Sequence, residues 1–267
     1  MNRFVRRISK YPRLYIRCAR TAFSAAAAYR MNFMAGIIIT FFSNILFPLV
    51  TIVIYGAGLS FPGWTFYQVL LIQSIFTVSS GISNMFFQGI FRETNNAVHD
   101  GLFEIILLKP VEPLFYLAAT SLNPESSALV AGGCVMFGIS AAHVPGITGA
   151  AVPVFILFML AGICVMLGLT LVMSAVSFKW VGNSRLPELF GSVLELAKYP
   201  LGIYPHSVRA FATFVVPVAL VAAVPAAVLT GSIESSYFTA VVPCILLVVA
   251  GIVLYKLMIR MYESAGG

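Results

Sequence analysis

Long apolar runs separated by short polar turns dominate the chain. Residues 31–91 contain no Lys, Arg, Asp or Glu, and residues 126–178 contain none either. Each run far exceeds the stretch of about 20 apolar residues that crosses a bilayer as a helix. Strands of a membrane barrel would alternate in polarity at every second residue, and these runs do not. The pattern therefore predicts an all-α membrane protein.

Turn residues divide the apolar sequence into six predicted transmembrane helices. The glycine- and proline-containing turns GAGLSFPG (56–63) and HVPGITG (143–149) separate two pairs of them. The predicted spans cover, approximately, residues 32–55, 64–90, 123–142, 151–178, 187–200 and 237–257.

Residues 201–233 stay apolar but carry three prolines, Pro205, Pro217 and Pro225. Proline at this frequency argues against one straight crossing. We expect a pair of short re-entrant helices between spans five and six, whose free backbone groups other protein must shield from lipid.

The start of span three has two possible positions. In SLNPESS (121–127), Asn123 is suited to cap a helix, Pro124 to open it and Glu125 to occupy its first turn. The alternative is one kinked helix from Pro113, which would place Glu125 inside the membrane. The first start is favoured, because an unpaired carboxylate there costs about 2.5 kcal/mol or more.

Basic residues predict the orientation. Residues 1–30 hold eight Lys and Arg, and the segments 91–115, 179–185 and 256–260 hold two each, so 14 of the 16 lie on one side of the spans. The positive-inside rule then places both termini in the cytoplasm. Lys198 and Arg209 are the exceptions.

The basic N-terminal segment, residues 1–30, has a helical repeat. Arg13, Arg17 and Arg20 recur at helical spacing after Pro12, which predicts an amphipathic helix lying on the cytoplasmic leaflet. The alternative interpretation is a disordered basic tail. The segment lacks an immediate apolar core, so we expect no cleaved signal peptide.

Composition agrees with a membrane protein and narrows its function. Of 267 residues, 60% are hydrophobic and 9% are charged, and the net charge is +7. The positive charge clusters beside apolar spans, so nucleic-acid binding is not expected. The four cysteines lack metal-ligand spacing, and the three histidines, His99, His143 and His206, lie near predicted helix ends rather than in a ligand cluster.

No catalytic motif appears in the sequence. G-x-x-x-x-G-K-[ST], H-E-x-x-H and G-x-S-x-G are all absent. We therefore expect a single transmembrane domain over residues 1–267 that is not an enzyme and binds no cofactor or metal.

Two charged regions remain. In VHDGLFEIILLKPVEPLF (98–115), Gly101 and Pro110 bracket a short apolar stretch, which indicates either a protein contact or a loop on lipid headgroups. In span five, Glu195 and Lys198 are spaced to pair, either along a translocation route or as a structural pair. Glu188 fits the first turn of the helix, where the helix dipole would stabilise it.

The order of these features resembles the membrane subunit of a type-2 ATP-binding-cassette exporter. The likeness covers nearly the whole chain. Its motifs are DGLFEIILLKPVEPLF (100–115) and, more specific, YPLGIYPHSVRAFATFVVPVALVAAVPAAVLTG (199–231).

This resemblance implies that the 91–115 segment docks on a separate ATPase subunit and that the 201–233 segment closes the outer end of the pathway. The implied ATPase contacts are Arg92, Glu93, His99, Asp100, Gly101, Glu104 and Lys109. The implied pathway or outer-gate residues are Glu195, Lys198, Tyr199, Pro200, Tyr204, Pro205 and Arg209.

The resemblance also implies the assembly. Two permease chains, identical or homologous, would form the pathway in a bacterial plasma membrane, and two ATPase subunits would hold the ATP and Mg. Motion of the ATPase dimer would reach spans one, two and five through the 91–115 segment. The alternative function is a secondary transporter or channel driven by an ion gradient, which would place ionisable groups in mid-membrane.

Overall fold

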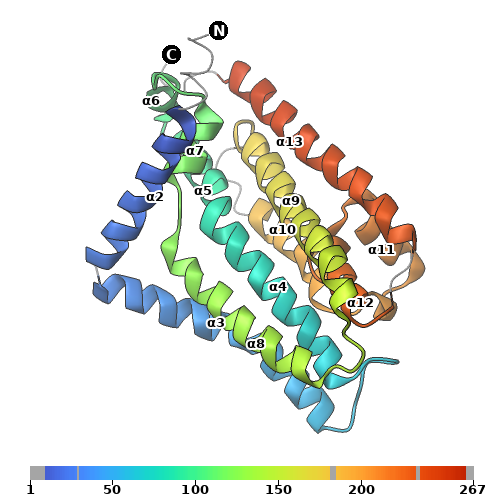
Figure 1. The fold of residues 1–267 in the computed structure, drawn as a ribbon. Coiled ribbons are helices and arrows are strands. Elements are labelled where there is room, and N and C mark those ends of the chain that lie inside the picture. The colour runs from blue at the N-terminus through green and yellow to red at the C-terminus, as the bar shows by residue number, and fades with distance from the viewer. Residues whose placement is uncertain (1–9, 29, 181–184, 233–234, 263–267) are drawn as a thin grey trace.

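The computed structural model describes residues 10–28, 30–180, 185–232 and 235–262, and every regular element in these ranges is helical (Figure 1). This confirms the all-α class. The longer helices are α2 (Lys10–Ala28), α3 (Arg30–Gly56), α4 (Phe66–Phe86), α5 (Gln88–His99), α8 (Ser127–His143), α9 (Val152–Ser177), α10 (Arg185–Glu195) and α13 (Val241–Arg260). The short helices are α6 (Phe103–Leu107), α7 (Pro113–Thr120), α11 (His206–Ala210) and α12 (Ala223–Leu229).

Within the residues that the structure describes, four helical stretches are long and apolar enough to cross a membrane. They are Phe66–Phe86, Pro124–His143, Gly149–Ser177 and Ser235–Arg260. The count rises to five if the pair Tyr11–Ala28 and Phe33–Phe42, which is bent by 93°, forms one span. The expectation of six crossings is therefore not confirmed and stays a prediction. The main departure is span five, because α10 has only 11 residues and is about 16 Å long.

Span three starts where its capping residues predict. The Asn123 side chain accepts a hydrogen bond from the Glu125 backbone N–H at 3.1 Å, and Pro124 opens the 3₁₀ turn η1 (Pro124–Ser126) that leads into α8. The backbone N–H of Asn123 also donates to the Met85 carbonyl at the end of α4. The break before Asn123 separates α7 from α8, so the single kinked helix from Pro113 does not form.

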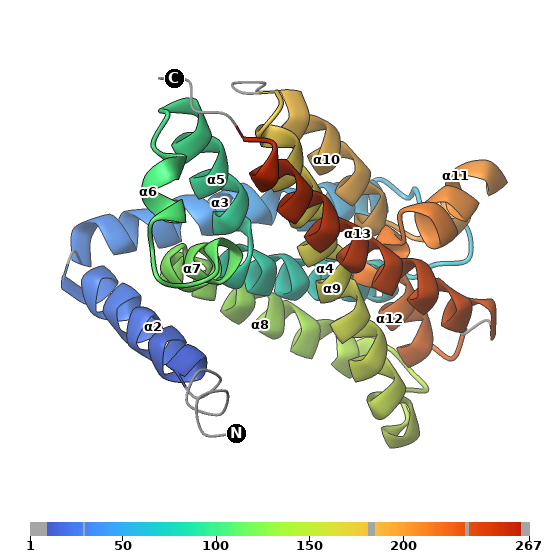
Figure 2. The same cartoon turned by 90° about the horizontal axis from the view of Figure 1, so that it is seen from above.

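Two closely packed helix pairs form the body of the molecule, α4 with α8 and α9 with α13 (Figures 1 and 2). Glycines lie where the helices touch. A Cβ atom at Gly81 of α4 would come within 2.9 Å of the Val130 backbone N, and one at Gly251 of α13 would come within 3.0 Å of the Gly168 carbonyl. Small residues at these positions let the backbones approach, as is typical of helices packed in lipid.

Residues 201–232 contain no long helix. They form the short turns η4 (Leu201–Ile203), η5 (Phe211–Val215) and η6 (Val218–Val221), with α11 between the first two and α12 after the last. Every residue from Val218 to Leu229 is buried, and η6 and α12 pack against α9 and α4. Proline breaks the region as expected; its placement in a bilayer stays a prediction.

Within the N-terminal segment, Lys10–Ala28 forms the helix α2, while residues 1–9 and 29 lie outside the described ranges. The placement of this helix on a membrane surface stays a prediction. Tyr11 at the start of α2 packs edge-on against Phe115 of α7, with ring centroids 4.6 Å apart. The histidines lie at helix ends as predicted: His99 ends α5, His143 ends α8 and His206 begins α11.

Candidate functional site

The 91–115 segment forms a compact elbow at one end of the molecule. It consists of the second half of α5, a turn, the short helix α6 and the start of α7 (Figure 1). The two ends of the elbow connect to α4 and, through η1, to α8. Any force applied to the elbow therefore reaches two of the long helices directly.

Gly101 sets the angle between α5 and α6. Its φ of 67° lies in the left-handed region, which glycine adopts without a Cβ penalty. The Gly101 N–H donates to the Val98 carbonyl, and the Leu102 N–H donates to the Ala97 carbonyl at 2.8 Å. This pair of bonds is the Schellman pattern, which satisfies the last carbonyls of α5 and fixes the direction of the chain.

The exit from the elbow is capped as well. The Glu112 carboxylate accepts a hydrogen bond from the Phe115 backbone N–H at 2.9 Å, and Pro113 opens α7. Pro at the first position and an acidic N-cap both favour a helix start here. Glu112 therefore has a structural role as the N-cap of α7, and this role explains the carboxylate that follows the apolar stretch.

Phe103 anchors α6 to the body of the protein. It is fully buried, and its ring lies edge-on to Phe178 at 4.8 Å and to Tyr262 at 5.5 Å between centroids. Phe178 follows α9 and also touches Tyr255 of α13, at 5.5 Å. We call these four rings the aromatic cluster; it joins the elbow to the ends of α9 and α13.

A buried hydrogen bond reinforces this junction. The hydroxyls of Thr94 on α5 and Tyr255 on α13 lie 3.1 Å apart, and both residues are buried. A buried hydroxyl without a partner would cost free energy, so the pairing favours one register between the two helices.

The outward side of the elbow is apolar with charged neighbours. Leu108 is 84% exposed, and Leu102 and Ile105 are each about half exposed. Glu104 in the first turn of α6 and Lys109 after its end are exposed beside them. We call Leu102, Ile105 and Leu108 the apolar tip.

The structure separates the residues that the sequence assigned to one contact site. Asp100, Gly101, Glu104 and Lys109 lie on α6 and the residues that flank it, and the His99 ring lies 3.0 Å from the Asp100 carboxylate. Arg92 and Glu93 lie further back on α5, with Nε and Oε1 3.7 Å apart.

The predicted outer-gate residues lie at the end of α10, on η3 (Leu196–Lys198) and in the segment that follows. Lys198 Nζ is 3.4 Å from Glu195 Oε1, so the spacing-based pairing is confirmed, and it is 5.3 Å from the Phe76 ring centroid. Tyr199 packs on Phe61 of the turn before α4, at 5.8 Å between centroids. Phe61 precedes the start of α4, whereas the elbow follows the end of α4.

The other predicted residues continue the same segment. Pro200 is buried, Tyr204 is half-buried, and Pro205 and Arg209 are exposed. The Arg209 N–H donates to the Pro205 carbonyl in α11. These residues lie along one stretch of the chain that runs from the end of α10 into α11.

A cavity of about 400 Å³ lies between α10 and the junction of α4 with α5. We call it the amide cavity, after its polar lining residues: Asn84, Gln88, Arg92, Asn95, Asn96 and Asn123. The opposite wall is apolar and includes Pro187, Phe190 and Leu194 of α10. No Asp or Glu is among the described residues that line it.

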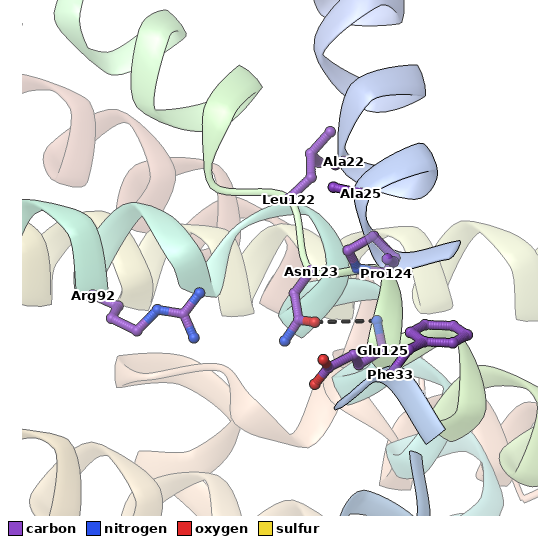
Figure 3. A pocket seen from close by; sticks show the side chains of 9 residues that line it. Ala22, Ala25, Phe33, Arg92, Leu122, Asn123, Pro124 and Glu125 are labelled. Carbon is purple, nitrogen blue, oxygen red and sulfur yellow. Dashed lines mark hydrogen bonds between the residues drawn. The ribbon is translucent and has the colours of Figure 1, made fainter. Parts of the chain in front are cut away.

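A second cavity of about 370 Å³ adjoins Arg92 on its other side, beneath α2 (Figure 3). Arg92 and Asn123 line both cavities. In Figure 3 the Arg92 side chain points toward Asn123, whose Oδ1 accepts the Glu125 N–H along the dashed line. The Glu125 carboxylate faces this second cavity and lies against Gly36 of α3.

Sequence reasoning missed the amide cavity, although a signal was present. Asn84, Gln88 and Arg92 follow one another at intervals of four, which places them on one helical face. These uncharged polar side chains lie beside a long apolar run, in which single amides also occur as isolated residues between packed helices. The Thr94–Tyr255 pair, 161 residues apart in sequence, left no local signal.

In the described parts of the chain, no group of three or more His, Cys, Asp or Glu side chains is placed to hold a metal ion. Of the cysteines, Cys244 is buried and its thiol donates to the Ala161 carbonyl at 3.3 Å, within the α9–α13 interface.

Comparison with known proteins gives one family. The family described as "ABC-2 family transporter protein" matches residues 31–266. No curated protein matches the chain. Apolar membrane-length helices, an elbow with an apolar tip and a family match over most of the sequence agree with one another, and the chain belongs to the ABC-2 family of transporter membrane proteins.

Proposed function

We propose that this chain is the permease subunit of an ATP-driven exporter, in which two permease chains form the pathway and two separate ATPase subunits supply the energy. ATP and Mg would bind in the ATPase subunits. Family membership supports the permease role. The exposed apolar tip of the elbow is the observation that supports a contact with the ATPase.

The apolar tip is the feature that favours a protein partner. Three large apolar side chains are exposed on the five-residue helix α6 and its two cap residues, with Glu104 and Lys109 beside them. A helix this short is not stable alone, yet here it is held by the Schellman turn and by Phe103. A rigid protrusion with an apolar centre and a charged rim has the anatomy of a protein interface.

Rigidity matters for the mechanism. A flexible loop would absorb the motion of an ATPase dimer, whereas an elbow capped at both ends would pass it on. The contacts of the elbow run to α4 through α5 and to the ends of α9 and α13 through the aromatic cluster. Motion would thus reach α9 and α13 as well as α4, a wider route than the sequence suggested.

The proposed function includes an orientation of the chain in the membrane. The elbow would face the cytoplasm, together with both termini, in the plasma membrane of a bacterium. The turn at 144–148 and the Tyr199 region would then face outward. Tyr199, Lys198 and Arg209 would lie near the outer headgroups, which accounts for two cations that depart from the positive-inside rule.

Purification of the tagged chain from its native membranes tests the proposal. We expect a nucleotide-hydrolysing subunit to co-purify, and Leu108→Ser to lower its recovery at least about tenfold, because burying a leucine at an interface is worth about 1.5–3 kcal/mol. The matched control is Leu59→Ser, since Leu59 is 65% exposed in the turn after α3, far from the elbow.

The two variants separate the outcomes. Equal recovery of the ATPase with both variants would show that the apolar tip is not the contact. The absence of any ATPase from the parent preparation, under conditions that preserve membrane complexes, would reject the exporter assignment itself.

A further inference from the structure

The amide cavity has a lining suited to a ligand, and nothing in the elbow mechanism uses it. The side chains of Asn84, Gln88, Asn95 and Asn96 make no hydrogen bond within the part of the chain that the structure describes. Each carries an amide group with two N–H donors and a carbonyl acceptor. Four such groups facing one cavity leave many hydrogen bonds to be made by a guest or by water.

Arg92 gives the cavity a positive charge. Arg92 Nε lies 3.7 Å from Oε1 of Glu93, the next residue of α5, and the Arg92 side chain is 58% exposed. This is a weak contact that leaves the terminal guanidinium amines available. Those amines form a planar fork that matches the oxygens of phosphate and carboxylate groups.

Asn123 contributes a donor of fixed orientation. Its Oδ1 accepts the Glu125 N–H in the cap of η1, so the amide plane is set by the backbone. The Nδ2 amine then points away from the cap and lines the same cavity as Arg92. On this wall, the N–H donors of Arg92 and of the amide side chains therefore outnumber the amide oxygens that could accept hydrogen bonds.

The opposite wall selects the rest of the ligand. Phe190 and Leu194 are one helical turn apart on α10 and both are half-buried against the cavity. An apolar chain laid along α10 would cover them, while the polar wall would face the headgroup.

We propose that the amide cavity binds an anionic amphiphile, with a phosphate or carboxylate headgroup on Arg92 and the amides and its apolar chain along Phe190 and Leu194 of α10. The inference deepens the proposed function, since it gives the class of molecule that the pathway would accept. The source of that molecule is either the surrounding bilayer or a soluble amphiphile.

Photolabelling tests the site directly. The full chain with its co-purified subunits is placed in nanodiscs of phosphatidylcholine and exposed to decyl phosphate carrying a terminal diazirine. We expect labelled peptides from α10, and at least about tenfold less label in Arg92→Gln, because a charge-assisted hydrogen-bond pair is lost. Arg92→Lys keeps the charge and is expected to retain most of the label.

Matched variants guard against indirect effects. Arg260→Gln removes an exposed arginine from the last turn of α13, away from the cavity, and should leave labelling unchanged. Asn95→Asp keeps the size of the side chain but adds a negative charge to the lining, so it should also reduce labelling. The apparent unfolding temperature of each variant reports whether it is folded.

Competition identifies the ligand class and its source. Excess decyl phosphate should remove the label, and decyl maltoside should not; equal competition by both would overturn the anionic assignment, as would equal labelling of the parent and Arg92→Gln. If phosphatidylglycerol added to the nanodisc competes, the headgroup comes from the bilayer. If only soluble decyl phosphate competes, it comes from solution. ATPase recovery is measured separately, so loss of labelling and failure of the permease role are distinguishable.

Discussion

At the scale of single residues, glycines decide how closely the backbones approach. Gly162 on α9 is one of the tightest cases, because a Cβ atom there would collide with the Leu220 carbonyl oxygen and come within 2.6 Å of the Val221 Cα. Both neighbours are backbone atoms of the buried η6 turn, which has no room to move. One methyl group would therefore push apart two central elements.

Gly162→Ala is expected to destabilise the protein. Overpacking of this kind costs about 1–3 kcal/mol and should lower the apparent unfolding temperature by several degrees. The control is Gly138→Ala in α8, where nothing lies within 4 Å of the new Cβ. That variant should be neutral or more stable, since alanine favours a helix by about 0.5–1 kcal/mol over glycine. Equal midpoints for the two variants would contradict the packing argument.

Residue roles that depend on local spacing could be predicted from the sequence. Asn123 as a helix cap and the Glu195–Lys198 pair follow from short intervals along the chain, and both are present. The position of Arg92 could not be predicted in this way. The resemblance suggested a contact with the ATPase, which stays a prediction, and the structure adds that Arg92 lines the amide cavity opposite α10.

At the scale of elements, the elbow shows how a five-residue helix acquires a fixed position. α6 makes few hydrogen bonds of its own, so its stability comes from its surroundings. The Schellman turn fixes its entry, and the aromatic cluster holds its inner face. Removing the one buried side chain of α6, Phe103, should free the element without disturbing the long helices.

Phe103→Ala is expected to increase amide hydrogen exchange over residues 98–110 while exchange in α4 and α9 stays unchanged. Replacing a buried phenylalanine by alanine costs about 3–5 kcal/mol, and Phe103 is the buried side chain of α6. Ile105→Ala, on the exposed side of the same helix, should leave the exchange rates as they are. Unchanged exchange in Phe103→Ala would show that the caps alone hold the elbow.

The long helices were predictable because their apolar runs exceed the membrane thickness and end at glycine, proline or charge. The ends of α4, α8 and α9 agree closely with those runs. Span five was not predictable in length. Its apolar run continues past Tyr199, but Pro200 and Pro205 end the helical segments early, and the following residues pack inward as short turns.

At the scale of the whole molecule, the elbow and the turn between α8 and α9 lie at opposite ends of the bundle (Figure 1). Leu108 and Thr148 are both exposed at these ends. The proposed orientation puts Leu108 in the cytoplasm and Thr148 outside. This orientation rests on the distribution of Lys and Arg along the chain, and it can be measured directly.

Labelling of single cysteines with a membrane-impermeant maleimide measures the orientation. In a background without Cys18, Cys134, Cys164 and Cys244, and without the ATPase, Leu108→Cys should react only in inside-out vesicles. Thr148→Cys should react only in intact cells or right-side-out vesicles. Reaction of both from the same side would rule out the arrangement, and detergent-treated membranes, in which both must react, serve as the control.

The buried stretch from Val218 to Leu229 has a consequence for how anything could cross this membrane. It plugs the space between α4 and α9 with side chains that expose almost no surface. A molecule that crossed the membrane through the centre of one chain would have to displace this buried segment. Under the proposed function, the pathway would instead run along the outer face of this chain and be completed by a neighbouring permease chain, so that a single copy would not conduct.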